Sequence, residues 1–563
     1  EGGKLIDFEA SENNHFLAVT QLWIQSTGAA AKAGYRRPDI LLYINGLPLV
    51  FIELKNSNVK LRSAYDDNLT NYKADIPQLF LTNVFCVFSN GLETRLGSLS
   101  AEWEHFFHWL RPEDEKEKIR RDQIREQGTS TERLLQGLCA KEKLLDYVEN
   151  FVIYHKGTQK IIAQNHQFIG VNKGFDKFLR RGEFGGKLGV FWHTQGSGKS
   201  LTMVFAALKL KTHRGITSER LQNPNLLIVT DRIDLNTQIT KTFAAVGIPN
   251  IIQADSIRKL REVVTPGSAG KVVLSTIFKF HWDDPRLKSQ VLAQRLAALK
   301  ELAVGGSETW ILMVDEAHRT QEKDLGAYVR AVLPRATRFG FTGTPVKKGD
   351  TDTFQNFGAP GEQYLDKYGI DDAVKDGATV PIKYQGRMTE WHLHDKEIDV
   401  LFDQWFAGEP PEKVEELKRR GVTKGDLARF GPRIELIAQD IWAHYRVSVM
   451  PDGFKAQICA IDRRACVAYK KALDRVIAKS LRKTKGYGKK KAKRKAAEMS
   501  VSVYSPGQHD GEQYPDLVTY QIPPEDVTPK VVPRFQDPAA PLRFVIVCNK
   551  LLTGFDAPIE QAM

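Results

Sequence analysis

The segment from residue 188 to residue 208 constrains the fold more than any other part of this chain. The apolar run Leu-Gly-Val-Phe-Trp at 188–192 is typical of a short buried strand, and the small-residue loop Thr-Gln-Gly-Ser-Gly follows at 194–198. Apolar residues at helical spacing begin directly after Lys199-Ser200. A strand, a glycine loop and a helix in this order form the context that a phosphate-binding loop requires. We therefore expect an α/β fold with a parallel sheet.

The residue types in this loop suit the phosphates of a nucleotide. Glycine permits close approach of backbone N–H groups, and the N-terminus of the following helix adds partial positive charge. We expect Lys199 to reach the β- and γ-phosphates and Ser200 to bind Mg²⁺. His193 stands where the motif ordinarily has its first glycine. The predicted nucleotide-binding residues of the loop are Thr194, Gln195, Gly196, Ser197, Gly198, Lys199 and Ser200.

A second motif agrees with nucleotide hydrolysis. The sequence Trp-Ile-Leu-Met-Val-Asp-Glu-Ala-His at 310–318 is an apolar run that ends in carboxylates, as a buried parallel strand should. We expect Asp315 to hold Mg²⁺ through its water shell and Glu316 to orient the water that attacks the γ-phosphate. We expect His318 to couple the nucleotide state to neighbouring motifs, among them the strand that ends in Thr-Gly-Thr-Pro at 342–345.

The N-terminal third contains a separate group of charged residues. Two β-rich apolar runs flank Asn45-Gly46, which is a strong hairpin signal. Asp39 begins the first run, whereas Glu53 and Lys55 end the second and share one face of the strand. The hairpin therefore brings Asp39 beside Glu53 and Lys55. Two carboxylates suit Mg²⁺, which activates water and stabilises charge on a phosphodiester, while Lys55 holds the water or the developing oxyanion.

Composition restricts the class of protein. The 563 residues predict three or four domains, and the net charge of +13 favours a polyanionic partner, most simply nucleic acid. The five cysteines lack metal or disulfide spacing, which suits a reducing cytoplasm. The chain has no apolar run of about 18 residues and therefore no expected membrane span. It begins without methionine or a signal-peptide hydrophobic region, so we expect a fragment.

Pro38-Asp39 and Glu53-Leu54-Lys55 resemble the core motif of PD-(D/E)xK nucleases. In that fold an acidic residue on an N-terminal helix can join the metal site. The resemblance implies this role for Glu12, with a capping or solvated glutamate as the alternative. Restriction-type members carry Gln-x-x-x-Tyr on a helix, where both side chains face one way. Asn68 and Tyr72 occupy these two positions here, with asparagine in place of glutamine.

The phosphate-binding loop, Asp-Glu-Ala-His and Thr-Gly-Thr-Pro, in this order, resemble the motor of superfamily 2 helicases. The resemblance implies a glutamine that reads adenine. We select Gln167, 32 residues before Lys199, with Gln164 as the alternative. It also implies contacts with DNA phosphates at the ends of strands, where sheet-edge capping is the alternative. The predicted DNA-binding residues are Arg232, Thr276, Lys279 and Thr553, the last in a Thr-Gly-Phe-Asp sequence that resembles helicase motif V.

Residues 381–563 are expected to form a second, incomplete motor domain. We expect a charged helical insertion at 390–440 and loops in the proline-rich stretch 504–541. Nine Lys or Arg residues between 482 and 495 either follow DNA phosphates or belong to a solvated insert. The sequence ends at Met563 before an arginine-rich motif VI. Because that motif supplies the arginine finger, we expect this chain to bind nucleotide but to hydrolyse it poorly.

The complete order of motifs closely resembles the restriction (R, motor) subunit of type I restriction-modification enzymes. The predicted domains are a PD-(D/E)xK nuclease at 1–145, a first RecA-like motor domain at 146–380 and a second at 381–563. The resemblance implies ATP and Mg²⁺ as cofactors, with duplex DNA and the methyltransferase and specificity subunits as partners. It implies a cytoplasmic prokaryotic enzyme that translocates along unmethylated DNA and cuts it away from the recognition site.

Three other interpretations remain open. A superfamily 2 repair or remodelling motor would have an N-terminal domain that binds DNA without cutting it. A non-catalytic scaffold would not bind ATP. A type III restriction subunit would carry its nuclease at the C-terminus.

Overall fold

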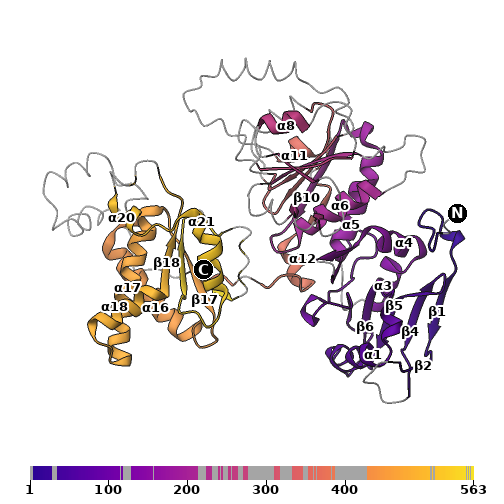
Figure 1. Cartoon of the computed structure of the whole chain (residues 1–563), viewed down its shortest axis with the longest axis horizontal. Helices are drawn as coiled ribbons and strands as arrows, with labels where there is room; N and C mark the ends of the chain where they lie inside the picture. Colours follow the sequence, from indigo (N-terminus) through magenta and orange to yellow (C-terminus); the bar gives the residue numbers. More distant parts are fainter. Residues whose placement is uncertain are drawn as a thin grey trace. The chain divides into compact units, whose positions relative to one another are not determined.

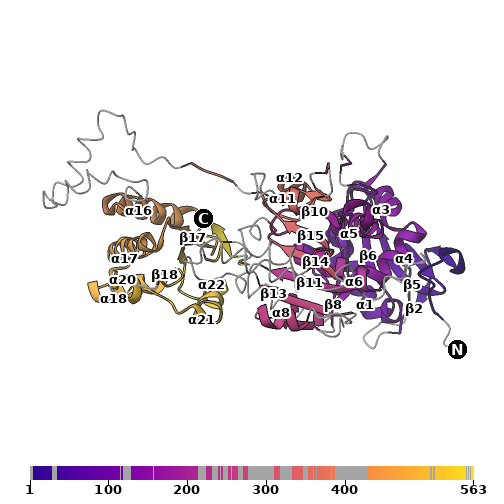
Figure 2. The ribbon, with the colours of Figure 1, turned by 90° about the horizontal axis from the view of Figure 1, so that it is seen from above.

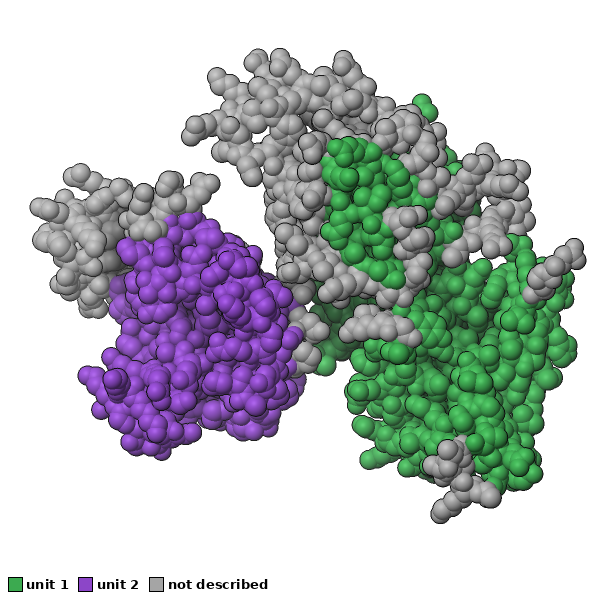
Figure 3. Space-filling view, in the orientation of Figure 1, with its two compact units in different colours: residues 1–382 green, residues 383–563 purple. Residues whose placement is uncertain are grey.

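The computed structural model confirms the predicted α/β class with parallel sheets. It describes residues 4–27, 34–114, 116–117, 128–155, 158–212, 224–230, 239–240, 243–244, 251–254, 257–263, 270–276, 310–317, 333–345, 353–358, 361–362, 364–381, 383–386, 428–507, 510, 514–548, 550–552, 555, 557 and 559–563. Two compact units comprise Glu1–Ile382 and Lys383–Met563 (Figure 3). Among the described residues, no helix is both long and apolar enough to cross a membrane.

The first sheet of the larger unit has five strands in the order β1-β4-β5-β6-β7. These strands are β1 (Phe16–Thr20), β4 (Ile40–Ile44), β5 (Leu47–Leu54), β6 (Phe85–Ser89) and β7 (Thr94–Gly97) (Figure 1). Strands β4 and β5 form the predicted hairpin. Asn45 and Gly46 both adopt positive φ, 51° and 82°, as a two-residue type I′ turn requires. Strand β6 runs parallel to β5, whereas the other pairs are antiparallel.

A short helical segment covers one face of this sheet. It begins as a π-helix, η2 (Ala64–Leu69), and continues directly into α1 (Thr70–Asp75) and the 3-10 turn η3 (Pro77–Phe80). Its apolar side chains pack against Phe51 and Phe88 of the sheet. A π-helix is rare and is frequently found at functional sites. This one lies at the end of the sheet that carries Asp39 and Glu53.

The second sheet of the larger unit has seven parallel strands in the order β12-β13-β11-β14-β15-β10-β16. They are β10 (Lys187–His193), β11 (Asn225–Thr230), β12 (Ile251–Ala254), β13 (Val272–Thr276), β14 (Trp310–Asp315), β15 (Thr337–Thr342) and β16 (Asp366–Tyr368). Figure 2 shows five of them side by side, from β10 to β13. Because the strands are parallel, their carboxyl ends meet at one edge, where ligands of such sheets bind.

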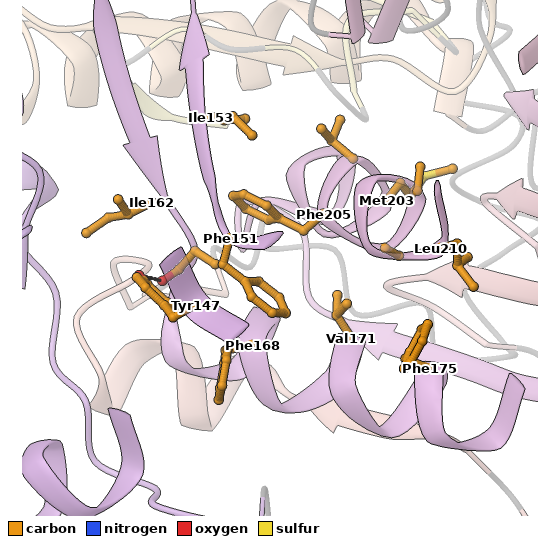
Figure 4. Close-up of a cluster of buried hydrophobic side chains, with 14 of the residues drawn as sticks. Tyr147, Phe151, Ile153, Ile162, Phe168, Val171, Phe175, Met203, Phe205 and Leu210 are labelled. Carbon is orange, nitrogen blue, oxygen red and sulfur yellow. Dashed lines mark hydrogen bonds between the residues drawn. The ribbon is translucent and has the colours of Figure 1, made fainter. Parts of the chain in front are cut away.

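One apolar core joins the two sheets. It includes Val50 of the first sheet and Phe191 of the second. Between them lie the aromatic rings of Tyr147, Phe151 and Phe168, and the ring centroids of Phe151 and Phe168 are 4.8 Å apart (Figure 4). The intervening elements are α3 (Ser130–Leu138), α4 (Lys141–Asn150), β8 (Val152–His155), β9 (Gln159–Ile162), α5 (Asn165–Leu179) and α6 (Lys199–Thr212). The boundary predicted at residue 145 falls inside α4, whose buried side chains belong to this core.

A buried arginine adds a polar connection to this core. Arg111 follows the first sheet, and its Nη1 donates to Oδ2 of Asp376 at 2.7 Å, just after α12 (Ile370–Lys375). The backbone N–H of Arg111 donates to Oδ1 of Asn165 at 3.0 Å, and Nδ2 of Asn165 donates to the carbonyl oxygen of Arg111 at 2.9 Å. Asn165 is the first residue of α5. The segment after the first sheet is thereby fixed to helices of the second.

The smaller unit contains a four-stranded parallel sheet in the order β18-β19-β17-β20. Its elements include α16 (Gly431–Ser448), β17 (Lys455–Cys459), α17 (Arg463–Lys485), α18 (Lys489–Met499), β18 (Ser500–Val503), β19 (Phe544–Val547) and β20 (Glu560–Ala562). The basic tract at 482–495 is largely helical, because it covers the end of α17 and the start of α18.

The smaller unit differs from one prediction, because helices interrupt a stretch that was expected to form loops. The proline-rich stretch at 504–541 is not only loop, because prolines occupy the first turns of α20 (Pro515–Thr519), α21 (Pro524–Asp526) and α22 (Val532–Gln536). Proline is favoured there since the first N–H groups of a helix need no intrahelical partner. Most of the predicted insertion at 390–440 lies outside the described residues.

Truncating Phe151 tests whether the two sheets unfold as one. We expect Phe151→Ala to destabilise the chain by about 3–5 kcal/mol, because it leaves a cavity in the shared core. Thermal unfolding should show the loss in probes of both sheets at the same temperature. Leu135→Ala, at a more exposed position on α3, should change stability by less than about 0.5 kcal/mol. Loss of the second sheet's signal alone would contradict a shared core.

Two candidate catalytic sites

Asp39, Glu53 and Lys55 lie together at the end of the β4–β5 hairpin that is opposite its turn. The two strands are paired up to the residues next to the carboxylates, which places Asp39 beside Glu53. Oδ2 of Asp39 accepts a hydrogen bond from the backbone N–H of Leu54 at 2.7 Å. Nζ of Lys55 lies 3.2 Å from Oε1 of Glu53. The structure therefore brings the three residues together, as the hairpin predicted.

The helical segment contributes the two other predicted residues. Nδ2 of Asn68, on η2, donates to Oε1 of Glu53 at 2.6 Å. The Tyr72 hydroxyl, on α1, donates to the carbonyl oxygen of Arg37 at 3.3 Å. Burial, with a smaller contribution from the charge of Glu53, raises the pKa of Tyr72 to about 12. Tyr72 is therefore a neutral donor at physiological pH.

Glu53 is the most electrostatically stressed member of this group. Glu53 is only 3% exposed, and its Oε2 has no hydrogen-bond partner among the described residues. Burial is the main cause that raises the pKa of Glu53 to about 7, Asp39 raises it further, and Lys55 opposes the shift.

These two carboxylates fit a hard divalent cation such as Mg²⁺, which would offset both burial and carboxylate repulsion. The described part of the chain contains no cluster of three or more His, Cys, Asp or Glu side chains suited to a metal. Asp39 and Glu53 would therefore be the protein's carboxylate ligands. The remaining ligands would be backbone carbonyl, water or substrate oxygens, which Mg²⁺ commonly accepts.

The structure does not bring Glu12 to this site. The helix expected around it is a three-residue 3-10 turn, η1 (Ser11–Asn13), and Glu12 is exposed on it. The next segment lies at the hairpin turn, where the N–H of Asn45 donates to the carbonyl oxygen of His15 at 2.9 Å. The five residues of β4, about 16 Å of strand, separate that turn from Asp39. Glu12 therefore has the position of the solvated glutamate that was the alternative interpretation.

The second site is the loop between β10 and α6. Gly196 and Gly198 have φ of 81° and 79°, in the left-handed region that favours glycine. A Cβ at Gly198 would lie only 2.7 Å from Nε2 of Gln167. Within the loop, the Ser197 hydroxyl donates to the carbonyl oxygen of Thr194 at 2.7 Å. The glycines that the motif predicts are thus required by backbone shape.

Three motifs meet at the carboxyl edge of the seven-stranded sheet. Nζ of Lys199, at the start of α6 before Ser200, lies 3.5 Å from Oε1 of Glu316. Asp315 is buried at the end of β14, next to Glu316. A Cβ at Gly343, just after β15, would lie 3.3 Å from Nζ of Lys199. Glu316 has a positive φ of 45°, a strained conformation that is concentrated at functional sites.

Gln167 does not have the environment expected for an adenine-reading residue. It is 1% exposed, and its Oε1 accepts from the backbone N–H of Gln164 at 2.8 Å. Its Nε2 donates to the carbonyl oxygen of Gly198 at 3.1 Å. Because both ends of the amide bind backbone, Gln167 supports the phosphate-binding loop from behind. The alternative, Gln164, is only half-buried and precedes α5.

A buried histidine–aspartate pair lies behind the same loop. Nε2 of His193 is 2.6 Å from Oδ2 of Asp366, and both side chains are fully buried. His166 lies beside His193, and its Nε2 is 2.9 Å from the carbonyl oxygen of Ser197. Burial holds the pKa of His166 well below its usual range. The sequence marks His193 as a departure from the motif but gives no signal for Asp366, because the two residues are 173 positions apart.

Of the other predicted site residues, the structure describes Thr276. His318, Arg232, Lys279 and Thr553 lie outside the described residues. Thr276 is the last residue of β13, where it pairs in parallel with Thr230 of β11. The contacts predicted for these residues with nucleotide or DNA stay predictions.

Comparisons with known proteins match the two candidate sites to two different families. Residues 166–415 match the SWI2/SNF2 ATPase family, and residues 1–105 match the N terminus of the type I restriction enzyme R protein. The two matches define a class in which an ATPase motor follows a restriction-enzyme N-terminal domain. The whole chain is 34% identical to the type I restriction enzyme HindI endonuclease subunit of Haemophilus influenzae, covering 51% of that protein. Over its full length the chain is therefore homologous to type I restriction enzyme endonuclease subunits, at 30–34% identity.

Two further comparisons show the extent of the similarity. A protein of Methanocaldococcus jannaschii with the provisional name type I restriction enzyme MjaIXP endonuclease subunit is 30% identical over the whole chain, which covers 51% of that protein. The chain thus spans about half the length of these curated relatives. The solved structure of the ATP-dependent Type ISP restriction-modification enzyme LlaBIII bound to DNA aligns with 72% of this chain and 26% of its own, at a TM-score of 0.38 and 14% identity.

The raised pKa of Glu53 predicts a pH-dependent stability. Because its pKa is raised from 4.5 to about 7, its favourable contribution is complete below about pH 4.5 and is lost as the pH rises through 7. As the pH rises from about 5 to about 8 without Mg²⁺, wild type should therefore lose on the order of 2–3 kcal/mol of stability that Glu53→Gln keeps. Unfolding midpoints measured across this range test the difference.

Mg²⁺ and a matched variant provide the controls for this measurement. Added Mg²⁺ should stabilise wild type at about pH 8 more than it stabilises Glu53→Gln, because it replaces the missing proton. Glu12→Gln, at an exposed glutamate outside the site, should follow wild type at every pH. If the unfolding midpoints of wild type and Glu53→Gln change with pH in the same way, the pKa of Glu53 is not raised in the folded chain.

Proposed function

We propose that this chain is the motor and nuclease part of a type I restriction subunit, an ATP-dependent DNA translocase and Mg²⁺-dependent endonuclease. Its substrate is unmethylated foreign duplex DNA, cut away from the recognition site. The observation that carries the proposal is the buried Glu53 carboxylate, which has one unpartnered oxygen beside Asp39 and Lys55. A buried and a half-buried carboxylate with a lysine on a rigid strand end form an arrangement suited to phosphodiester hydrolysis.

The residues around Glu53 have separate roles in this hydrolysis. When bound, Mg²⁺ supplies an activated water and neutralises charge on the phosphate. Lys55 holds the attacking water and the developing negative charge, while Asn68 fixes the orientation of Glu53. The water oxygen forms a bond to phosphorus as the bond from phosphorus to one deoxyribose oxygen breaks. The water gives up one proton to solvent, and the departing oxygen takes up one.

The motor part uses ATP at the loop between β10 and α6. Lys199 binds the β- and γ-phosphates, Ser200 and Asp315 hold the Mg²⁺ of the nucleotide, and Glu316 orients the attacking water. The ion pair of Lys199 with Glu316 places both side chains together at the loop. Gln164 is the better candidate for adenine, since the amide of Gln167 is engaged by backbone. His318 links this site to neighbouring motifs.

The remaining parts of the proposal concern partners and location. The net charge of +13 favours a DNA partner, and Arg232, Thr276, Lys279 and Thr553 are the proposed phosphate contacts. Methyltransferase and specificity subunits of the same system would supply sequence recognition. The free cysteines of the described residues suit a reducing cytoplasm, and the similarity to type I restriction enzyme subunits supports a prokaryotic source.

Plasmid cleavage by the assembled enzyme tests this function. The full-length subunit that contains this chain is combined with its methyltransferase and specificity subunits and an unmethylated plasmid that carries the target site. With Mg²⁺ and ATP, wild type should linearise the plasmid, whereas Lys199→Ala and Asp39→Ala should lose at least about 100-fold in cutting rate. ATP hydrolysis should survive in Asp39→Ala, because that carboxylate belongs only to the nuclease site.

Glu12→Ala is the matched acidic control and should cut as wild type does, because Glu12 lies at the other end of the first sheet. Normal cutting by Asp39→Ala would make the hairpin residues structural. The chain would then be a repair or remodelling motor with a DNA-binding N-terminal domain. Cutting that needs no ATP would contradict the motor part of the proposal.

A further inference from the structure

A small two-stranded ribbon begins directly beside Asp39. It consists of β2 (Ile24–Gln25) and β3 (Tyr35–Arg36), paired antiparallel. The N–H of Gln21, just after β1, donates to the carbonyl oxygen of Asp39 at 2.8 Å. Gln21 has a positive φ of 54°, which turns the chain away from the sheet and into the ribbon. Figure 1 shows β2 beyond the end of β1 and β4, next to α1.

The ribbon presents aromatic rings and a cation to solvent. Trp23 is 63% exposed and Tyr35 is 59% exposed, and their ring centroids are 6.4 Å apart in an edge-to-face arrangement. The Cζ atom of Arg37 lies 5.2 Å from the centre of the Trp23 ring. Arg37 forms no ion pair with any residue that the structure describes. Large exposed aromatic side chains next to an available cation are typical of a binding surface.

The ribbon is held firmly, despite this exposure. Ile24 packs against the apolar core under α1. Nε of Arg36 donates to Oδ2 of Asp75 at 2.6 Å, and Nε2 of Gln78 donates to the carbonyl oxygen of Gln25 at 3.1 Å. Its continuation is fixed by Tyr72, which binds the carbonyl oxygen of Arg37. The aromatic surface therefore has a defined position relative to Asp39 and Glu53.

We propose that Trp23, Tyr35 and Arg37 form a surface that binds duplex DNA beside the phosphate to be cut. The proposal rests on the nuclease function proposed above. The guanidinium of Arg37 contacts a phosphate, and the Trp23 ring packs against a deoxyribose or a partly unstacked base. Charge favours DNA here, because Asp39 and Glu53 repel a phosphate and the exposed guanidinium of Arg37, which has no ion pair among the described residues, offsets that repulsion.

Photo-cross-linking and cutting by the assembled enzyme test this surface together. Duplex DNA that carries 5-iododeoxyuridine is irradiated on the enzyme in Ca²⁺, and the attached peptides are identified by mass spectrometry. Cross-links should form at Trp23 or Tyr35 in wild type. Trp23→Ala should reduce the cutting rate in Mg²⁺ roughly tenfold, in the range seen when one aromatic contact with nucleic acid is removed. Trp23→Phe should retain most of it.

Tyr154→Ala is a matched control. Tyr154 is also exposed, at 47%, and Nζ of Lys160 lies 5.7 Å from the centre of its ring. This pair lies at the other end of the first sheet, because Lys160 also binds the carbonyl oxygen of Asn83, just before β6. Tyr154→Ala should cut as wild type does. ATP hydrolysis should be unchanged in all three variants.

The outcomes separate this proposal from the nuclease function. If wild type cuts and Asp39→Ala does not, but Trp23→Ala cuts normally and no cross-link forms on the ribbon, the surface proposal is wrong and the nuclease stands. A second outcome is that the Trp23→Ala subunit no longer assembles with the partner subunits, although it still cross-links to DNA at residues outside the ribbon. The ribbon is then a protein interface and the proposal also fails. If wild type does not cut at all, the nuclease function itself is refuted.

Discussion

The apolar core that runs between the two sheets of the larger unit determines where every candidate site can lie. Val50, Phe151 and Phe191 belong to one buried cluster, although they come from the first sheet, the connecting segment and the second sheet. The phosphate-binding loop and the hairpin carboxylates are therefore parts of one compact unit. Burial of large aromatic side chains supplies much of the free energy that holds such a unit together.

Both candidate sites hold unfavourable features where strands end. Glu53 is buried with one oxygen unpartnered among the described residues, while Gln21, whose N–H binds the carbonyl oxygen of Asp39, and Glu316 in the motor site have positive φ. Such features are unfavourable in isolation, so the surrounding fold must enforce them. A cation relieves the charge at Glu53, and backbone strain such as that of Glu316 is concentrated at functional sites, so there is a physical reason to regard each strand end as a binding site.

The sequence predicted best where the deciding interactions are local. Asp39 and Glu53 come together because Asn45-Gly46 closes a two-residue hairpin between them, and the loop glycines are needed for positive φ. The position of Glu12 was not predictable in this way, because a short turn takes the place of the expected helix and leaves Glu12 at the opposite end of the sheet. The partners of Gln167 were not predictable either, because they are backbone groups, one of them in a loop that is distant in sequence. Residue patterns do not report which backbone group a buried amide will meet.

The hydrogen bonds of Arg111 have a consequence for how such subunits can evolve and be engineered. Arg111 connects the segment after the first sheet to both α5 and the end of α12, so elements on either side of residue 145 share one polar network. Exchanging only the N-terminal part between relatives would leave a buried guanidinium opposite partners from another lineage. Because the two sheets share this polar network and one apolar core, we expect viable chimeras to be joined after α12.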